Sequence, residues 1–306
     1  MSGSTATGTI DTAERQPRRV GRFAPSPTGP LHLGSLATAA ASFLDARHSG
    51  GHWLVRIEDI DAARAIPGAA DEILRQLDLL GFRWDGPVVY QSKRLELYEH
   101  ALAELRSREL TYECSCSRRD RGGTDDSGGY SGACRHGPLR SGPTATRFRA
   151  DLSPGGPFHD RLHGLVDVDA TAQGDPIVRR RDGCYAYQLA VVVDDAEQGV
   201  TDVVRGDDLL PSTGWQRSLQ RALEVSEPSY AHLPLVCERD GGKLSKSAHA
   251  LAADIAEPKL LWQVLMLLKQ RPPAELAGAP PETLWNWAIA HWQLRALRGV
   301  ASLPTG

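Results

Sequence analysis

The chain has 306 residues, a formal net charge of −3, 41% hydrophobic residues and 24% charged residues. These values are typical of a globular protein with a sizeable core, and apolar runs such as Leu189–Val193 are too short to span a membrane. A negative net charge argues against unspecific binding to DNA. Five cysteines without a secretory signal indicate a reducing, cytoplasmic location, where thiols are available to bind metal.

The first part of the chain predicts alternating strands and helices. Residues 1–20 are rich in Ser, Thr, Gly and Arg, and we expect them to form a flexible tail. Short apolar segments predict strands at 20–24 and 53–57, and helical spacing or propensity predicts helices at 33–47, 68–80 and 93–106. Alternation of this kind predicts a parallel sheet with crossover helices, an α/β fold.

Between residues 112 and 164 the pattern changes to short pieces rich in Cys, Gly and Arg. We expect an insertion there with little core of its own, which a bound metal would stabilise. The α/β pattern resumes over residues 165–248, although periodicity does not decide whether Leu189–Val193 is a strand or a buried helix. Apolar residues at helical spacing predict a short helical region over residues 249–306.

A turn between the first strand and the first helix contains His32-Leu33-Gly34-Ser35 after a proline-rich stretch. The start of a helix offers free N–H groups and the positive end of the helix dipole to a phosphate. His32 and the small Gly34 would allow a nucleotide to approach closely. Taken alone, the turn is equally well explained as a connector with an incidental histidine.

A second motif, Lys243-Leu244-Ser245-Lys246-Ser247, follows Asp240-Gly241-Gly242. Two lysines on a glycine-hinged loop suit the stabilisation of negative charge that develops on a phosphoryl group. A lysine-rich loop is usually solvated surface. The presence of both motifs, at the two ends of one α/β region, argues against that interpretation here.

Together the two motifs resemble the paired signatures of class I aminoacyl-tRNA synthetases. Further segments are similar to the glutamate-binding stretches of glutamyl-tRNA synthetases, namely Arg22-Phe23-Ala24-Pro25-Ser26, Arg56-Ile57-Glu58-Asp59, Tyr187 and Val203-Val204-Arg205-Gly206. The similarity covers roughly residues 21–247. It implies a Rossmann-like class I catalytic core whose nucleotide-binding halves are residues 21–111 and 165–248.

The resemblance implies a glutamate site made by Arg22, Phe23, Ala24, Pro25, Ser26, Glu58, Tyr187 and Arg205. Arg22 and Arg205 can each offer a planar fork to a carboxylate, whereas the neutral side chain of glutamine would not offset the free-energy cost of burying two guanidinium groups. Glu58 suits the α-ammonium group, with Ser26 and Tyr187 as hydrogen-bonding partners. The alternative for Glu58 is an ordinary surface pair with Arg56.

The implied reaction is attack of the glutamate α-carboxylate on the α-phosphorus of ATP, giving glutamyl-adenylate and pyrophosphate. The nucleophile is already ionised at neutral pH, so no general base is required. Alignment and charge neutralisation fall to His32, Lys243, Lys246 and a magnesium ion carried with ATP, and the ATP-binding residues are His32, Gly34, Ser35 and Lys246. Ser35 departs from the wider class, where this position is a second histidine.

Three cysteines in the expected insertion, Cys114, Cys116 and Cys134, suit a tetrahedral zinc site with one ligand open. Ligand chemistry alone favours His136 as the fourth ligand. The resemblance instead implies Tyr130, because glutamyl-Q tRNA(Asp) synthetases, short paralogues of glutamyl-tRNA synthetases, carry a Cys-x-Cys…Tyr-x-x-x-Cys pattern here. Unmetallated cysteines remain the alternative. The isolated Cys184 and Cys237 are expected in the core.

Residues 248–306 are too few for the large anticodon-binding domain of a glutamyl-tRNA synthetase. The short paralogues activate L-glutamate without tRNA and transfer it to queuosine in the anticodon of tRNA(Asp), and we expect this activity from a monomer that does not bind membranes. The first alternative is a truncated glutamyl-tRNA synthetase that charges the 3′ end of tRNA(Glu). The second is a non-catalytic tRNA-binding descendant of the fold.

Overall fold

A seven-stranded sheet forms the centre of the protein in this computed structural model, which describes residues 18–117, 120, 130, 132–237 and 253–305. In sheet order the strands are β3 (Val89–Tyr90), β2 (His52–Ile57), β1 (Val20–Phe23), β9 (Asp202–Gly206), β10 (Ser229–Leu233), β6 (Phe158–Asp160) and β7 (Gly164–Val166). The pairs from β3 to β6 are parallel, and β7 adds an antiparallel edge. The predicted α/β fold with a parallel sheet is confirmed.

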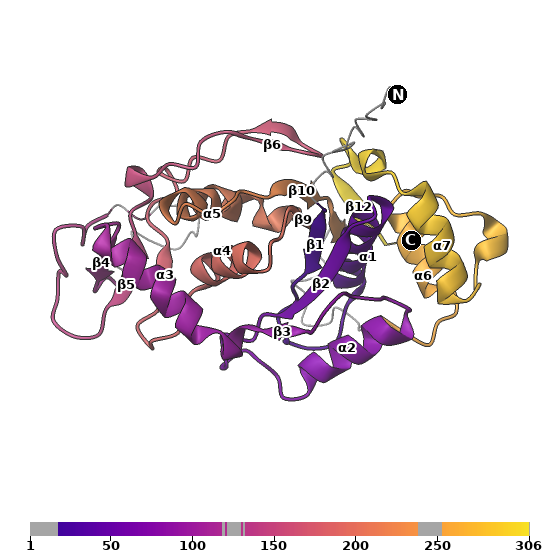
Figure 1. Ribbon diagram of the computed structural model, residues 1–306, viewed down its shortest axis with the longest axis horizontal. Helices are drawn as coiled ribbons and strands as arrows, with labels where there is room; N and C mark the ends of the chain where they lie inside the picture. The colour runs from indigo at the N-terminus through magenta and orange to yellow at the C-terminus, as the bar shows by residue number, and fades with distance from the viewer. Residues whose placement is uncertain (1–17, 118–119, 121–129, 131, 238–252, 306) are drawn as a thin grey trace, which may run out of the picture.

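Five helices accompany the strands (Figure 1). They are α1 (Leu33–His48), α2 (Ala69–Leu79), α3 (Leu95–Ser107), α4 (Tyr187–Glu197) and α5 (Leu210–Ala222). Each predicted helix is present with its ends shifted by a few residues. The segment that periodicity left undecided, Leu189–Val193, lies within α4, where its first four residues are buried.

The connection from α1 to β2 depends on Gly51. A Cβ atom at this position would lie 2.4 Å from the carbonyl oxygen of Arg19, which a side chain cannot do. That carbonyl accepts a hydrogen bond from the backbone N–H of His52 at the start of β2. Gly51 therefore lets the chain reverse tightly enough for β2 to pair with β1.

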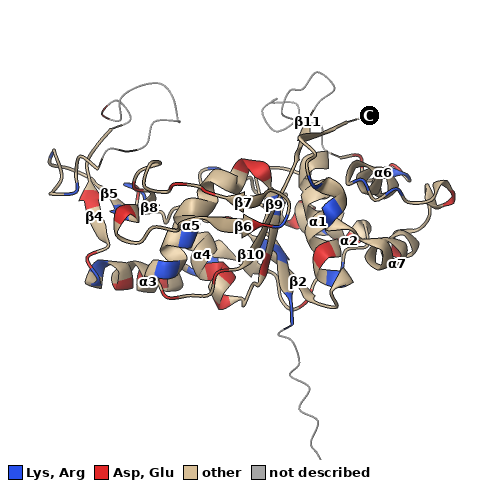
Figure 2. Ribbon diagram, turned by 90° about the horizontal axis from the view of Figure 1, so that it is seen from above, with Lys and Arg blue, Asp and Glu red and all other residues tan. Residues whose placement is uncertain are grey.

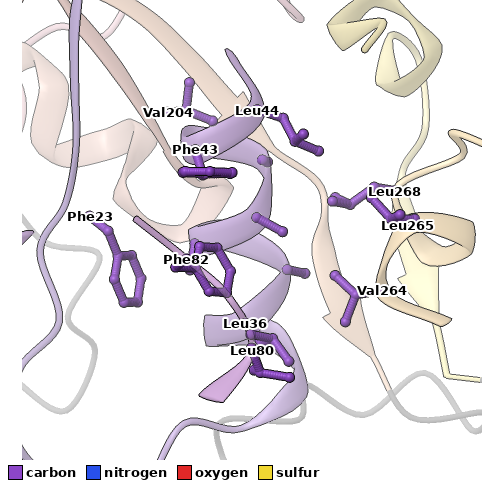
Figure 3. Packing of buried hydrophobic residues seen from close by; sticks show 14 of the residues in the cluster. Phe23, Leu36, Phe43, Leu44, Leu80, Phe82, Val204, Val264, Leu265 and Leu268 are labelled. Atoms are coloured by element: carbon purple, nitrogen blue, oxygen red, sulfur yellow. The ribbon is translucent and has the colours of Figure 1, made fainter. Parts of the chain in front are cut away.

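The C-terminal part of the chain packs directly on α1. Helix α6 (Leu260–Leu267) contributes Val264 and Leu265 to the hydrophobic cluster that contains α1 (Figure 3). Helix α7 (Pro281–His291) contributes Trp285 to the same cluster. The ring of Trp285 lies 4.9 Å from that of Phe43 on α1, measured between centroids. The short strand β12 (Ser302–Pro304) then pairs with β11 (Leu235–Cys237).

A second, antiparallel sheet lies at the opposite end of the molecule from α6 and α7 (Figures 1 and 2). Its strands are β4 (Thr111–Cys114), β5 (Ala145–Phe148) and β8 (Ile177–Arg179). The segment expected as an insertion, residues 112–164, therefore contributes most of β4 and all of β5 to this sheet and β6 to the large one, and it ends at Gly164, the first residue of β7. Among the residues that the structure describes, no helix combines the length and apolar character needed to cross a membrane.

Candidate active site

A cavity of about 690 Å³ lies beyond the carboxyl ends of β1, β2, β9 and β10. The chain leaves β1 toward β2 on one side, and β9 lies on the other side, so the cavity occupies a point where the strand order changes direction. Ligands of open α/β sheets bind at such points. The predicted glutamate- and ATP-binding residues that the structure describes all line this cavity, namely Arg22, Phe23, Ala24, Pro25, Ser26, His32, Gly34, Ser35, Glu58, Tyr187 and Arg205.

His32 caps the start of α1 through its imidazole ring. Its Nδ1 accepts hydrogen bonds from the backbone N–H groups of Gly34 and Ser35, over 3.1 and 3.2 Å. The proton of the neutral ring therefore resides on Nε2, which donates to Ser35 Oγ over 2.9 Å. Burial lowers the pKa of His32 below its usual value and favours this neutral form. The hydroxyl that replaces the second histidine of the class thus fixes the orientation of the first.

Gly34 leaves room beside this ring. A Cβ atom at Gly34 would lie 3.1 Å from the His32 ring and 3.7 Å from Val236. Both neighbours line the cavity, so a larger residue would narrow it where the start of α1 is exposed to a ligand. This geometry suits a phosphate near the first turn of the helix.

One wall of the cavity carries a buried network of charges. Asp195 on α4 lies between two arginines, with Oδ1 3.3 Å from Arg22 Nε and 2.8 Å from Arg56 Nη1. Burial acts to raise the pKa of Asp195, but the charges of Arg22 and Arg56 outweigh it and hold that pKa below its usual value. A buried carboxylate therefore holds Arg22 at the cavity wall.

Glu58 follows β2 and shares Arg56 with Asp195, over 3.3 Å between Oε1 and Nη2. Arg56 is completely buried and Glu58 is 7% exposed, so the alternative of a surface pair is wrong. Burial raises the pKa of Glu58, although Arg56 and Arg22 oppose that rise. The backbone N–H of Glu58 donates to the carbonyl of Pro25, which ties the two loops of the site together.

Arg205 on β9 forms the opposite side of the cavity and is 3% exposed. Its Nη2 donates to Thr213 Oγ1 over 2.8 Å, and its Nη1 approaches Tyr187 Oη at 3.5 Å. Its Nε donates to Nε2 of His232 on the adjacent strand β10. Burial raises the pKa of Tyr187, so its hydroxyl stays protonated and can donate to an anion.

The two lysines of the second motif, Lys243 and Lys246, lie outside the described residues. The described residues that flank the motif in sequence are close to the cavity. Val236 on β11 lines it, and the backbone N–H of Ala253 donates to the carbonyl of Leu31, another lining residue.

The thiols of Cys114, Cys116 and Cys134 lie within 4.8 Å of one another beside the small sheet. Tyr130 Oη is 3.3 Å from Cys114 Sγ and 3.5 Å from Cys116 Sγ. His136 is exposed and does not belong to this group. The three thiols could supply three of the four donors of a tetrahedral metal site, and the phenol oxygen of Tyr130 lies beside two of them.

The electrostatics of Cys134 suit a metal ligand. Burial acts to raise its pKa, but hydrogen bonds from the backbone N–H of Leu139 and from Tyr130 outweigh burial and lower the pKa to about 6. Metals bind thiolates rather than thiols. The other two cysteines of the chain, Cys184 and Cys237, are only half-buried, so their expected place in the core is wrong.

Comparisons with known proteins agree with this geometry. The family described as class I tRNA synthetases (E and Q), catalytic domain, matches residues 19–259. The glutamyl-Q tRNA(Asp) synthetase of Idiomarina loihiensis is 47% identical over 89% of this chain and 96% of its own length. That of Dechloromonas aromatica is 50% identical over 90% of this chain and 95% of its own length.

The chain belongs to the glutamyl-Q tRNA(Asp) synthetase family. It is therefore an enzyme of the class I tRNA synthetase type, a family of ATP-dependent ligases. A solved glutamate-tRNA synthetase from Elizabethkingia anophelis superposes with a TM-score of 0.77 at 26% identity, over 95% of this chain and 68% of the other. The membership in this family that the sequence motifs indicated is confirmed.

The sequence did not reveal the buried residues that hold the cavity arginines in place. Asp194 and Asp195 lie seven and eight residues after Tyr187, and so on the same face of α4 as Tyr187. The available signal was a pair of acids directly after the apolar run that ends at Val193, which is unusual in a buried segment. Asp194 accepts hydrogen bonds from Arg94, Gln91 and Tyr98.

Proposed function

We propose that this protein activates L-glutamate with ATP, without requiring tRNA, and transfers the glutamate to queuosine in the anticodon of tRNA(Asp). The names of the relatives support the overall activity, because proteins about 48% identical over about 90% of the chain are glutamyl-Q tRNA(Asp) synthetases. The observation that carries the proposal for glutamate is the placement of Arg22 and Arg205 on adjacent strands at one cavity, with Glu58 beside them.

The cavity matches the charges of an amino acid with an acidic side chain. Arg22 and Arg205 offer two cationic groups for the two carboxylates, and Glu58 offers an anion for the ammonium group. A carboxamide would leave one buried guanidinium without a counter-charge, which disfavours glutamine. Ser26, together with Phe23, Ala24 and Pro25, forms the wall between β1 and the turn that His32 caps.

In the first chemical step, an oxygen of the glutamate α-carboxylate forms a bond to the α-phosphorus of ATP while the bond to pyrophosphate breaks. We propose that the first turn of α1, with His32 and the Ser35 hydroxyl that its ring orients, and the side chains of Lys243 and Lys246 bind the phosphates and stabilise the developing charge. Magnesium carried with ATP neutralises phosphate charge. In the second step the acceptor group of queuosine bonds to the glutamyl carbonyl carbon, and AMP leaves.

We propose that Cys114, Cys116, Tyr130 and Cys134 hold one zinc ion. When bound, zinc supplies a structural crosslink between β4 and the segment that carries Cys134. Zinc is favoured over hard divalent metals such as magnesium and calcium because three of the four donors are soft thiolates. We further propose that the protein acts as a monomer in the cytoplasm, where its tRNA substrate is found.

The test is transfer of labelled glutamate, in the presence of ATP, to three acceptors: tRNA(Asp) containing queuosine, tRNA(Asp) lacking it, and tRNA(Glu). We expect label on the first alone. Label on tRNA(Glu) would indicate ordinary aminoacylation instead. Absence of label on all three, with folded and metal-loaded protein, would favour a tRNA-binding protein without catalysis.

The first step is tested separately by glutamate-dependent exchange of pyrophosphate into ATP without tRNA. Lys246→Ala should reduce the exchange rate by roughly 10²- to 10³-fold, which is typical for loss of one group that stabilises developing charge. Lys259→Ala is the matched control, because Lys259 is exposed just before α6. Full exchange activity in Lys246→Ala would contradict the proposed role of that lysine.

A further inference from the structure

Arg205 is held from behind by a histidine that the proposed mechanism does not use. His232 on β10 is directly opposite Arg205 on β9 in the register of the two parallel strands. Its Nε2 lies 3.1 Å from Nε of Arg205 and accepts a hydrogen bond from it. The two side chains are 0% and 3% exposed, so water does not compete for this contact.

The tautomer of His232 is fixed by Asp160 on β6. Nδ1 of the ring lies 2.7 Å from Oδ2 of Asp160, so Nδ1 carries the proton and Nε2 keeps its lone pair. Asp160 is itself held in place, because Oδ1 accepts hydrogen bonds from the backbone N–H groups of Leu162 and His163. The opposite tautomer would set Nε2–H against the Nε–H of Arg205.

The partners of Arg205 are neutral, whereas Arg22 has a charged partner. Arg22 forms an ion pair with the carboxylate of Asp195. In the described part of the chain, Arg205 forms no ion pair, and its hydrogen-bond acceptors are neutral. These acceptors are His232 Nε2, Thr213 Oγ1, the carbonyl oxygen of Leu209 and, at 3.5 Å, Tyr187 Oη.

From this geometry we infer that His232 is a positioning residue for glutamate recognition. As a neutral acceptor it turns the Nη1 edge of Arg205 toward the cavity and leaves the charge of Arg205 available for a substrate carboxylate. A carboxylate in its place would orient Arg205 equally well but would cancel that charge, and with it the preference for glutamate over glutamine. The inference rests on the proposed function, since it assigns a role in glutamate binding.

Two substitutions separate the two hydrogen bonds of the ring. In His232→Asn the amide reaches the position of Nδ1, so the contact with Asp160 is kept and the acceptor for Arg205 is lost. In His232→Gln the amide oxygen reaches the position of Nε2, so that acceptor is kept. His159→Asn, on the exposed side of β6, is the matched control.

The measurement is the steady-state rate of glutamate-dependent pyrophosphate exchange. In His232→Asn we expect the KM for glutamate to rise about 10- to 100-fold, the range for loss of a hydrogen bond to a charged group. The KM for ATP and kcat should change by less than about threefold, and discrimination against glutamine should fall. In His232→Gln we expect a KM for glutamate close to that of the unchanged protein. The melting temperature of each variant is measured as well, to show that the variant is folded.

A pH profile gives a readout that a purely structural role would not affect. Protonation of His232 places a hydrogen on Nε2 against the Nε–H of Arg205, so glutamate binding should weaken as pH falls through the pKa of this ring. His232→Gln should lack that component. The groups that face the ring are Asp160, Arg205, Thr213 and Tyr230, with Asp207 the next charge and His163 bound to the His232 carbonyl oxygen.

The outcomes distinguish this inference from the proposed function. Absence of glutamate-dependent exchange in the unchanged protein would overturn the proposed function and this inference with it. Exchange in the unchanged protein, with an equal glutamate KM in folded His232→Asn, would overturn only the role of His232. If His232→Asn does not fold, the test is the pH dependence of glutamate binding. The same decrease at acid pH in the unchanged protein and in His232→Gln would then overturn the role of His232.

Discussion

The guanidinium of Arg22 and the carboxylate of Asp195 form a buried ion pair, with 3.3 Å between Nε and Oδ1 and side-chain exposures of 4% and 8%. The same carboxylate oxygen lies 2.8 Å from Arg56. One carboxylate thus balances a residue that faces the cavity and another that is completely buried. Asp195 therefore couples the stability of the sheet to the geometry of the site.

Replacing Asp195 by Asn should lower both the stability of the protein and its activity with glutamate. The change leaves Arg22 and Arg56 buried with less negative charge, and removal of one partner from a buried pair typically costs about 3–5 kcal/mol. We expect the free energy of unfolding, measured in urea, to fall by that amount and glutamate-dependent exchange to be lost. Asp78→Asn is the control, because Asp78 is 66% exposed and such pairs contribute less than about 1 kcal/mol. Equal effects of the two changes would contradict this role.

Glu58 predicts a pH dependence of glutamate use. Its carboxylate must be ionised to bind an ammonium group, and burial raises its pKa above the usual 4.5. As pH falls through that raised pKa, the site loses a negative charge and kcat/KM for glutamate should decrease. In Glu58→Gln we expect kcat/KM to be about 10- to 100-fold lower at neutral pH and to lack the part of the acid decrease that is due to Glu58, while the part due to His232 remains. An acid profile of Glu58→Gln identical to that of the unchanged protein would show that protonation of Glu58 does not cause the decrease.

The residues that sequence reasoning identified are those expected to touch substrate or phosphate. Arg22, Glu58 and Arg205 each follow or end a strand, and their charges have a clear meaning at the edge of a parallel sheet. His32 was found for the same reason, since it stands where a strand leads into a helix. The strands and helices themselves were predictable because their apolar spacing is regular.

The residues that were missed act through other residues. Asp195 orients Arg22 and His232 orients Arg205, and neither role leaves a local pattern in the chain. Arg56 was open to interpretation as a surface residue, because the sequence alone does not show that β2 is covered on both faces. Strands β6 and β7 have three residues each, too few for alternation to predict them.

The cluster of Cys114, Cys116 and Cys134 predicts a site that binds one metal ion per protein molecule. Cys134→Ser should reduce bound zinc from about one equivalent to none, whereas Cys184→Ser should retain it, as measured by elemental analysis of the purified protein. Tyr130→Phe should weaken zinc binding and His136→Asn should leave it unchanged, because the phenol oxygen rather than the imidazole lies beside the thiols. The reverse result for these two variants would make His136 the fourth ligand.

The C-terminal helices are expected to unfold together with the sheet. Trp285 on α7 packs against Phe43 and Phe82, with 4.7 Å between the ring centroids of Trp285 and Phe82, and its Nε1 donates to the carbonyl of Leu80. Trp285→Ala should lower the free energy of unfolding by about 3–5 kcal/mol because it leaves a cavity and an unpaired carbonyl. Trp287→Ala, which removes a half-buried ring that stacks on His291, should cost about 1 kcal/mol.

The joint unfolding is checked by recording two signals in the same urea titration. Tryptophan fluorescence reports chiefly on the cluster around Trp285, and far-ultraviolet circular dichroism reports on all helices. Coincident transitions in the unchanged protein and in Trp285→Ala would support one cooperative unit, because α1 shares its hydrophobic cluster with α6 and α7. A separate early fluorescence transition would mean that the C-terminal helices detach before the sheet unfolds, and that their packing on α1 contributes little to its stability.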